Sequence, residues 1–147
     1  MTIRFYKSIE PYGYLNNFRK APMFIYNAWY KNVEAAYQSR KTNDPDIQEK
    51  IRLIARPSEV RDYGQTIKLI DNWDNIKYAI MAECVLAKFV QHKDLRERLL
   101  STGDEYLIED SPVDSYWGCG SDGKGQNNLG RILMATRVLI AGEDEVC

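Results

Sequence analysis

The chain has 147 residues, the usual size of one domain, and its 44% hydrophobic and 28% charged residues are typical of a globular protein rather than a disordered one. Its 20 Lys and Arg residues are balanced by 21 Asp and Glu residues, so no overall positive field would hold a nucleic-acid backbone. We therefore expect a single domain over residues 1–147, with any polymer binding confined to a local site.

Short strands and capped helices are expected in the N-terminal third of the chain. Aromatic and β-branched residues cluster at residues 3–7 and 22–26 around a turn-rich segment, which predicts two strands of one small sheet. Helical periodicity begins after Asn32, whose side chain can serve as an N-cap. A second helix is expected after Asp44, because Pro45 then occupies its first position.

The rest of the chain is predicted to be mainly helical. Its clearest element is a helix over residues 74–91, where apolar residues form two adjoining stripes. So wide an apolar surface predicts a central, mostly buried helix, and the expected fold class is α+β, mainly α, with a small minor sheet. The other expected elements are a helix from near Ser58 to Gly64, a helix over 93–100, a strand over 106–109, a helix from Asn128 to Gly142 and a flexible acidic tail over 143–147.

The cysteines and the N-terminal sequence bear on the cellular setting. Cys84, Cys119 and Cys147 are far apart and form no C-x-x-C pair, so we expect reduced thiols and neither a disulfide framework nor a structural zinc site. The N-terminal sequence MTIRFYK lacks an apolar signal core, and no run reaches the roughly 18 apolar residues of a membrane span. We therefore expect a cytoplasmic protein that contacts no membrane.

The sequence contains one histidine, His92. Serine–histidine and cysteine–histidine catalysis and His-rich metal sites all need positioned imidazole groups. His92 lies at the expected junction of two helices, where a surface or cap role is favoured over a catalytic one. Any catalysis should therefore depend on carboxylates or lysine.

Residues 109–134 hold more acidic, aromatic and glycine residues than a connecting loop requires. Gly118, Gly120 and Gly123 match a G-x-G-x-x-G pattern, but they follow no buried strand of a βαβ unit, so a Rossmann site is excluded. The glycines can instead let backbone N–H groups converge on an anion beside the start of the helix at Asn128. A flexible turn explains the same glycines equally well.

Glu34, Asp114, Trp117 and Trp73 each have both a structural and a functional interpretation. Glu34 lies in a first helical turn, where a carboxylate commonly stabilises the helix dipole. Asp114 and Trp117 lie within one helical turn of each other, but Asp followed by an aromatic residue and Gly is also typical of a plain turn. Trp73 can pack as a hydrophobic staple, with Asp74 as the cap of the central helix, or can stack on a base.

Several blocks of the sequence are unspecific alone but become specific through their joint order and spacing. They are residues 13–18, 33–41, 71–77 with Met81, 88–91, 99–104, 109–134 and 133–137. In this order they resemble the NADAR superfamily, which is linked to NAD and ADP-ribose chemistry and includes the YbiA-like N-glycosidases. The resemblance covers essentially the whole chain.

The resemblance implies a single, mainly helical YbiA-like domain that hydrolyses the N-glycosidic bond between a ribose-phosphate or ADP-ribose group and a base or amine. Activities known in the family include cleavage of riboflavin-pathway intermediates and removal of ADP-ribose from guanine in nucleic acid. The implied substrate is thus a small phosphoribosyl or ADP-ribosyl compound, with ADP-ribosylated nucleic acid as a further partner to consider. No metal and no cofactor are implied.

The family pattern places an essential Glu at Glu34, an aromatic substrate platform at Trp73, and an active-site Asp and Trp at Asp114 and Trp117. Cleaving a ribosyl C–N bond builds positive charge on the sugar, so Glu34 and Asp114 are the candidates to stabilise that charge and activate water. Lys41 is a third catalytic candidate, because its amine could attack the sugar if burial lowers its pKa. An ion pair with Glu34 on the same helix face is an equal alternative for Lys41.

The block at residues 16–18 makes Asn17 and Phe18 candidate substrate ligands, and Gly118, Gly120 and Asn128 remain candidates for the phosphate side. Family members often carry Ser where Asn16 stands, His where Ala35 stands and Arg where Gln65 stands. These departures concern the substrate more than the reaction type. Ala35 and Gln65 also motivate an alternative function, a non-catalytic sensor that binds ADP-ribose or a related nucleotide.

Overall fold

Six helices and two two-stranded sheets form the described part of the chain, which in the computed structural model comprises the backbone of residues 1–146 and the side chains of residues 1–142. The fold class is the mainly helical α+β arrangement that the sequence predicts. In chain order the elements are β1 (Thr2–Phe5), the 3-10 turn η1 (Gly13–Leu15), β2 (Met23–Ile25), β3 (Ala28–Tyr30), α1 (Val33–Ser39), α2 (Pro45–Leu53), α3 (Pro57–Gly64), α4 (Trp73–Gln91), α5 (Lys93–Ser101), β4 (Tyr106–Glu109) and α6 (Asn128–Val146).

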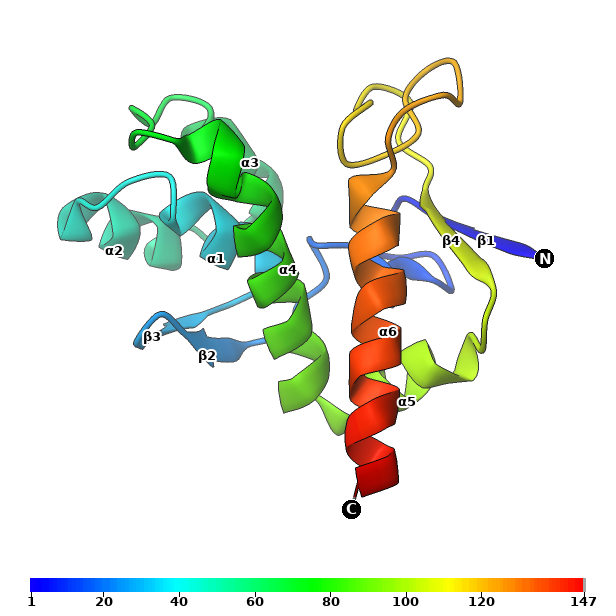
Figure 1. Cartoon of the computed structure of the whole chain (residues 1–147). Coiled ribbons are helices and arrows are strands. Elements are labelled where there is room, and N and C mark those ends of the chain that lie inside the picture. Colours follow the sequence, from blue (N-terminus) through cyan, green and yellow to red (C-terminus); the bar gives the residue numbers. More distant parts are fainter. Residues whose placement is uncertain (147) are drawn as a thin grey trace.

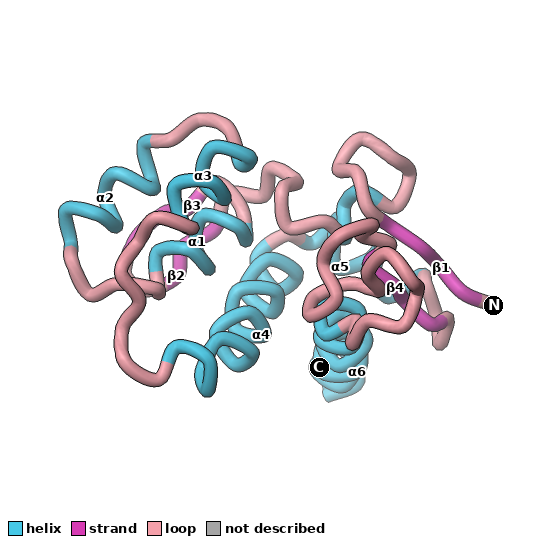
Figure 2. Tube along the Cα trace, turned by 90° about the horizontal axis from the view of Figure 1, so that it is seen from above, coloured by secondary structure: helices cyan, strands magenta, loops and turns pink. Residues whose placement is uncertain are grey.

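Helix α4 runs through the middle of the fold, between two groups of elements (Figures 1 and 2). One group contains α1, α2, α3 and the β2–β3 hairpin, and the other contains β1, β4, α5 and α6. Helix α4 packs against α1 on one side and α6 on the other. The predicted central helix is therefore present, with one face in the core: Met81, Cys84, Val85 and Phe89 are each at most 2% exposed. The prediction that it is mostly buried is wrong, because its opposite face reaches the surface, where Tyr78 is 41% exposed.

The pairing of the strands differs from the prediction. The sequence predicts one sheet made of residues 3–7 and 22–26, and this pairing is wrong. Strand β1 instead pairs in parallel with β4, in a register that places Phe5 opposite Glu109. This pairing joins segments that are far apart in the sequence, because β4 lies about a hundred residues after β1.

Strand β2 pairs with β3, a strand that the sequence pattern does not predict. The two connecting residues, Tyr26 and Asn27, have φ angles of 55° and 61°. Positive φ at both positions is characteristic of a type I′ hairpin turn. A hairpin closed by two residues loses little chain entropy, so this local pairing is favoured over pairing with a strand farther along the chain.

Two predicted helix caps are confirmed. The Oδ1 atom of Asn32 accepts a hydrogen bond from the Ala35 N–H at 2.8 Å, at the start of α1. At the start of α2, Asp44 Oδ1 accepts one from the Asp46 N–H at 2.9 Å, with Pro45 next in the chain. Each bond satisfies a backbone donor that the first helical turn leaves free.

The predicted start of α4 is wrong in detail. Trp73 is the first residue of the helix, and the capping position belongs to Asn72, which has a φ of 67° and makes no side-chain cap bond. Asp74 is not the cap, and its carboxylate pairs with Lys77 one turn further on. Trp73 cannot act as a staple residue either, because a staple precedes the cap.

Helix α6 continues to Val146, past Gly142 where the sequence predicts its end. The side chains of residues 143–147 and the whole of Cys147 lie outside the described residues, so the flexible acidic tail stays a prediction. Cys84 and Cys119 are free thiols, as predicted. None of the helices in residues 1–146 is both long and apolar enough to cross a membrane.

Lys88 is a buried cation that joins α4 to the N-terminal loop. Its side chain is 1% exposed, and its Nζ donates hydrogen bonds to the carbonyl oxygens of Tyr14 and Asn16. Burial, assisted by the nearby Arg19 guanidinium, lowers the pKa of Lys88 to about 7. The two bonds hold η1 and the residues that follow it against the central helix.

Replacing Lys88 with Met should change how stability depends on pH. In the unfolded chain Lys88 titrates near 10.5, whereas in the folded chain it titrates near 7. Between these values the unfolded state binds more protons, so the stability of the wild type should rise with pH relative to Lys88→Met, by up to about 1.4 kcal/mol per pH unit. Urea unfolding between pH 6.5 and 9.5 measures this difference. The exposed Lys93→Met is the control, and a pH-independent difference for Lys88→Met would contradict the expectation.

Candidate active site

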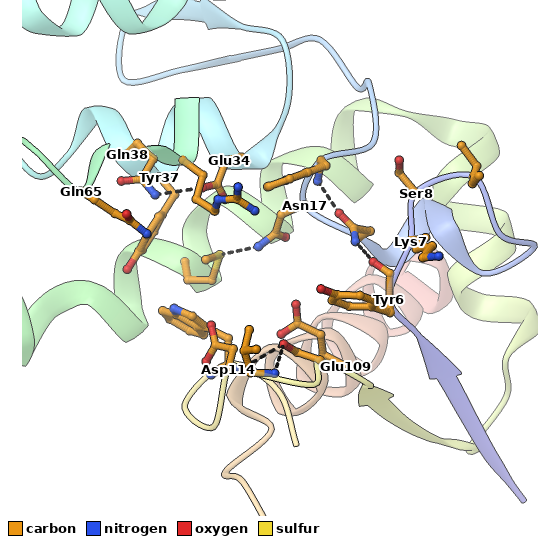
Figure 3. Close-up of a pocket in the computed structure, with 18 of the residues that line it drawn as sticks. Tyr6, Lys7, Ser8, Asn17, Glu34, Tyr37, Gln38, Gln65, Glu109 and Asp114 are labelled. Carbon is orange, nitrogen blue, oxygen red and sulfur yellow. Dashed lines mark hydrogen bonds between the residues drawn. The ribbon is translucent and has the colours of Figure 1, made fainter. Parts of the chain in front are cut away.

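A pocket of about 680 Å³ lies between the two groups of elements. Its lining comes from α1, α3 and α4 and from the loops that follow β1 and β4. Figure 3 shows Glu34, Tyr37 and Gln38 on one wall, Glu109 and Asp114 on the opposite wall, and residues 6–8 closing a third side. This volume falls in the range of sites that enclose small organic ligands.

Helix α1 builds the first wall. Glu34 and Gln38 lie one turn apart, and Gln38 Nε2 donates a 2.9 Å hydrogen bond to Glu34 Oε1. Glu34 is 7% exposed, so burial raises the pKa of its carboxyl group. The bond from Gln38 and the positive charges of Lys41 and Arg61 oppose this rise in pKa by stabilising the ionised form.

Lys41 follows α1 and lines the same pocket. Its Nζ donates a 3.4 Å hydrogen bond to the Gly64 carbonyl and lies 6.0 Å from the centre of the Tyr37 ring. Burial lowers the pKa of Lys41, although the negative charge of Glu34 works in the opposite direction. The two side chains form no direct ion pair in the described structure, so Lys41 is held near Glu34 without being neutralised by it.

The loop after β4 builds the opposite wall. Asp114 Oδ1 accepts hydrogen bonds from the backbone N–H groups of Tyr116 and Trp117, at 2.9 and 2.8 Å. The Trp117 ring stands edge-on to Tyr37 of α1, with 5.7 Å between the ring centres. Asp114 therefore has both expected features at once: it shapes a turn, and it lines the pocket.

The N-terminal loop closes the third side and is tied to α1 and α4. The Glu34 N–H donates to the Asn17 carbonyl at 3.2 Å, and Asn17 Nδ2 donates to the Met81 sulfur at 3.5 Å. The Phe18 ring lies under the Arg61 guanidinium, 5.7 Å from it. Asn17 and Phe18 thus line the pocket as expected of ligand-binding residues.

The family model of the NADAR domain matches this sequence over residues 4–141. The chain belongs to the NADAR family. It is 44% identical over 142 residues to the N-glycosidase Npun_R5314 of Nostoc punctiforme, covering 93% of this chain and 91% of that protein. It is 35% identical over 143 residues to the N-glycosidase YbiA of Escherichia coli K12, covering 96% of this chain and 89% of YbiA.

Two further comparisons bear on fold and context. The NMR structure of E. coli YbiA matches with a TM-score of 0.90 and 34% identity, over 98% of this chain and 87% of YbiA, which confirms the YbiA-like fold. The riboflavin biosynthesis protein VVA0006 of Vibrio vulnificus is 36% identical over 139 residues. This match covers 92% of the present chain but 37% of VVA0006. The NADAR domain thus occurs in the relatives both alone and as part of a longer protein.

Four of the predicted ligand-binding residues lie outside the lining of the NADAR pocket: Trp73, Gly118, Gly120 and Asn128. Trp73 is 5% exposed and packs behind Tyr37, with 5.3 Å between the ring centres, so it supports the wall instead of forming it. A Cβ atom on Gly118 would lie 2.8 Å from the Glu109 carbonyl oxygen, which explains the glycine by close backbone packing. The other six predicted residues line the pocket: Glu34, Lys41, Asp114, Asn17, Phe18 and Trp117.

The sequence interpretation missed Glu109, Arg61 and Gln38 as lining residues. The sequence places Glu109 at the end of a strand and at the start of the acidic segment 109–134 but assigns it no role, yet burial and the charges of Asp114 and Glu34 raise its pKa to about 8. One signal could have revealed it, since polar residues at the carboxyl end of a parallel strand often face a ligand site. Among the described residues, no group of three His, Cys, Asp or Glu side chains is placed to hold a metal ion.

Substituting Gly64 with Ala should disturb the Glu34–Gln38 pair. The added Cβ would lie 2.1 Å from Gln38 Oε1, so the amide would have to move. We expect a loss of about 1–3 kcal/mol in the free energy of unfolding, measured with urea. Gly142→Ala is the matched control, because a Cβ there meets none of the side chains described for residues 1–142 within 4 Å and should stabilise α6 by about 0.5–1 kcal/mol. Equal unfolding midpoints for Gly64→Ala and wild type would show that this packing is unimportant.

Proposed function

We propose that the pocket hydrolyses the C–N bond between C1′ of a phosphorylated ribose, or of ADP-ribose, and an amine or base. The chain is a hydrolase of N-glycosyl bonds, given its NADAR membership and its extensive identity to two relatives named N-glycosidases. The riboflavin biosynthesis name of a third relative supports a phosphoribosylated riboflavin intermediate as the substrate class. Free thiols at Cys84 and Cys119 support a reducing, cytoplasmic setting.

The observation that carries the proposal is the placement of Glu34 and Asp114 on facing walls of one pocket. Cleaving a ribosyl C–N bond builds positive charge at C1′, which carboxylates stabilise. Burial raises the pKa of Glu34, and the bond from Gln38 and two nearby cations oppose that rise; in its ionised form Glu34 can orient and activate the water. Asp114 uses Oδ1 for its turn, so its other oxygen is the one that can face the sugar.

The cations and aromatic rings of the pocket fit the remaining parts of such a substrate. Arg61 and Lys41 line the side near Glu34 and supply positive charge for a phosphate group. Tyr37 and Trp117 present ring edges and faces between the two walls, where a sugar or base can pack. A side that can bind a phosphate group, next to aromatic rings that can pack against a sugar or base, makes a phosphoribosyl compound the expected substrate.

The sensor alternative is not favoured. Ala35, one of the two positions that motivate it, is 2% exposed and lies outside the pocket lining. Gln65 does line the pocket, but it replaces a cation and not a carboxylate. Because Glu34 and Asp114 are both in place, the departures at these positions affect substrate choice more than turnover.

A Glu34→Gln variant tests the reaction. Wild-type protein should release free base or amine from a phosphoribosylated riboflavin-pathway amine or from ADP-ribosylated guanine in DNA. The variant should lose about 10²- to 10⁴-fold in kcat, because it cannot accept the proton of water. Calorimetry with ribose 5-phosphate should still detect binding to the variant. The control is Glu59→Gln, an exposed residue of α3, and wild-type turnover by Glu34→Gln would contradict the assigned role.

Lys41 has a second route open to it, in which its amine attacks C1′ as the bond to the leaving nitrogen breaks. The lysine nitrogen would lose its proton to solvent, the sugar ring would open to give an imine that borohydride can reduce, and water would then hydrolyse the imine to release the sugar. Trapping with borohydride during turnover, followed by mass spectrometry, should find the sugar on the peptide that contains Lys41 if this route operates. An unmodified peptide, together with substantial activity in Lys41→Arg, would leave Lys41 a phosphate ligand only.

A further inference from the structure

Glu109 is held in a fixed position at the edge of the pocket. It is the last residue of β4, and its backbone N–H donates to Asn127 Oδ1 at 2.9 Å. Its carbonyl accepts a 3.0 Å hydrogen bond from the Cys119 N–H. Since the main chain is anchored on both sides, the side chain projects into the pocket from a rigid support (Figure 3).

The carboxyl group of Glu109 has no partner of its own. Its Oε2 atom is buried and accepts or donates no hydrogen bond within the described part of the chain. The polar side chains of native proteins are usually satisfied when they are buried, and a catalytic or ligand-binding role is one recognised reason for an exception. An unpartnered carboxyl oxygen that lines a ligand pocket is therefore placed to meet the ligand.

The surroundings of Glu109 favour the neutral, protonated form of its carboxyl group. Apart from burial, the charges that shift the pKa of Glu109 are acidic, Asp114 from its own side of the pocket and Glu34 from α1. Lys7, Lys41 and Arg61 line the same pocket, but none of them forms an ion pair with Glu109 in the described structure. Together with burial, this environment raises the pKa of Glu109 to about 8, so the neutral acid predominates at pH 7.

We propose that Glu109 is the general acid of the reaction and protonates the leaving nitrogen of the substrate. This rests on the proposed N-glycosidase function and assigns it a residue that neither the family pattern nor the comparisons single out. It also narrows the substrate class to compounds whose leaving nitrogen needs a proton, such as amines and neutral amide nitrogens. Each of the three carboxyl groups then has its own role: Glu109 donates a proton, Glu34 accepts one, and Asp114 stabilises the positive charge on the sugar.

The step balances in atoms and charge. The C1′–N bond breaks, its electron pair goes to nitrogen, and nitrogen takes the proton of Glu109. The oxygen of water bonds to C1′, and the carboxylate of Glu34 takes the proton that this water loses. Glu109 is left as a carboxylate and Glu34 as an acid, and exchange with solvent restores both. The products are the sugar with a hydroxyl group at C1′ and the free amine or base.

A pair of substrates separates this role from a structural one. The first is a phosphoribosylated amine, whose leaving nitrogen needs a proton. The second is 4-nitrophenyl ribofuranoside 5-phosphate, whose leaving group departs as a stable anion. Glu109→Gln should reduce kcat at least about 100-fold on the first substrate and less than about fivefold on the second. Wild-type activity on the first should fall above about pH 8, and the residual activity of Glu109→Gln should lack that fall.

The adjacent Asp110→Asn is the matched control. Asp110 lies outside the pocket lining, pairs with Arg4 at 3.3 Å and should retain wild-type kcat on both substrates. Equal losses by Glu109→Gln on both substrates with an unchanged pH profile, or no loss at all, would overturn the general-acid role while leaving the N-glycosidase function intact. Wild-type protein that releases no product from any ribosylated substrate would instead overturn the proposed function and this role with it.

Discussion

The parallel pairing of β1 with β4 is the contact on which the pocket depends. It brings residues near the N-terminus against a strand about a hundred residues later, in register at Phe5 and Glu109, and α6 packs against β4. Carboxyl ends of parallel strands share one edge, so the chain leaves both strands on the same side, through Tyr6 and through the loop that carries Asp114. Helix α1, packed on α4, supplies the facing wall with Glu34. The pocket exists because this long-range pairing brings its walls together.

Two buried ionisable side chains, Lys88 and Glu109, have different roles in this molecule. Lys88 is fully buried, and two backbone carbonyls satisfy its amine, so its role is to hold the N-terminal loop against α4. Glu109 has no such partner, and its buried oxygen faces the pocket. The same desolvation that shifts both pKa values therefore produces a structural support in one case and a proton donor in the other.

Family membership and pocket geometry contribute different parts of the functional conclusion. The NADAR match and the N-glycosidase relatives supply the class of bond. The pocket indicates a separate catalytic role for each of its carboxyl groups. These groups come from α1, β4 and the following loop, and they differ in their hydrogen-bond partners. Gln65, neutral where the family often has Arg, leaves the lining with one cation fewer and is therefore expected to affect the choice of substrate.

What the sequence determined by itself was local. The caps at Asn32 and Asp44, the helical stripes and the mainly helical class were predictable, since each depends on residues a few positions apart. The tertiary structure alone decided the strand pairing, the place of Trp73 behind Tyr37 and the role of Gly118 in backbone packing. It also decided the pKa of Glu109, because burial and the charge of Glu34, which is distant in the sequence, act on this carboxyl group only once the fold has formed.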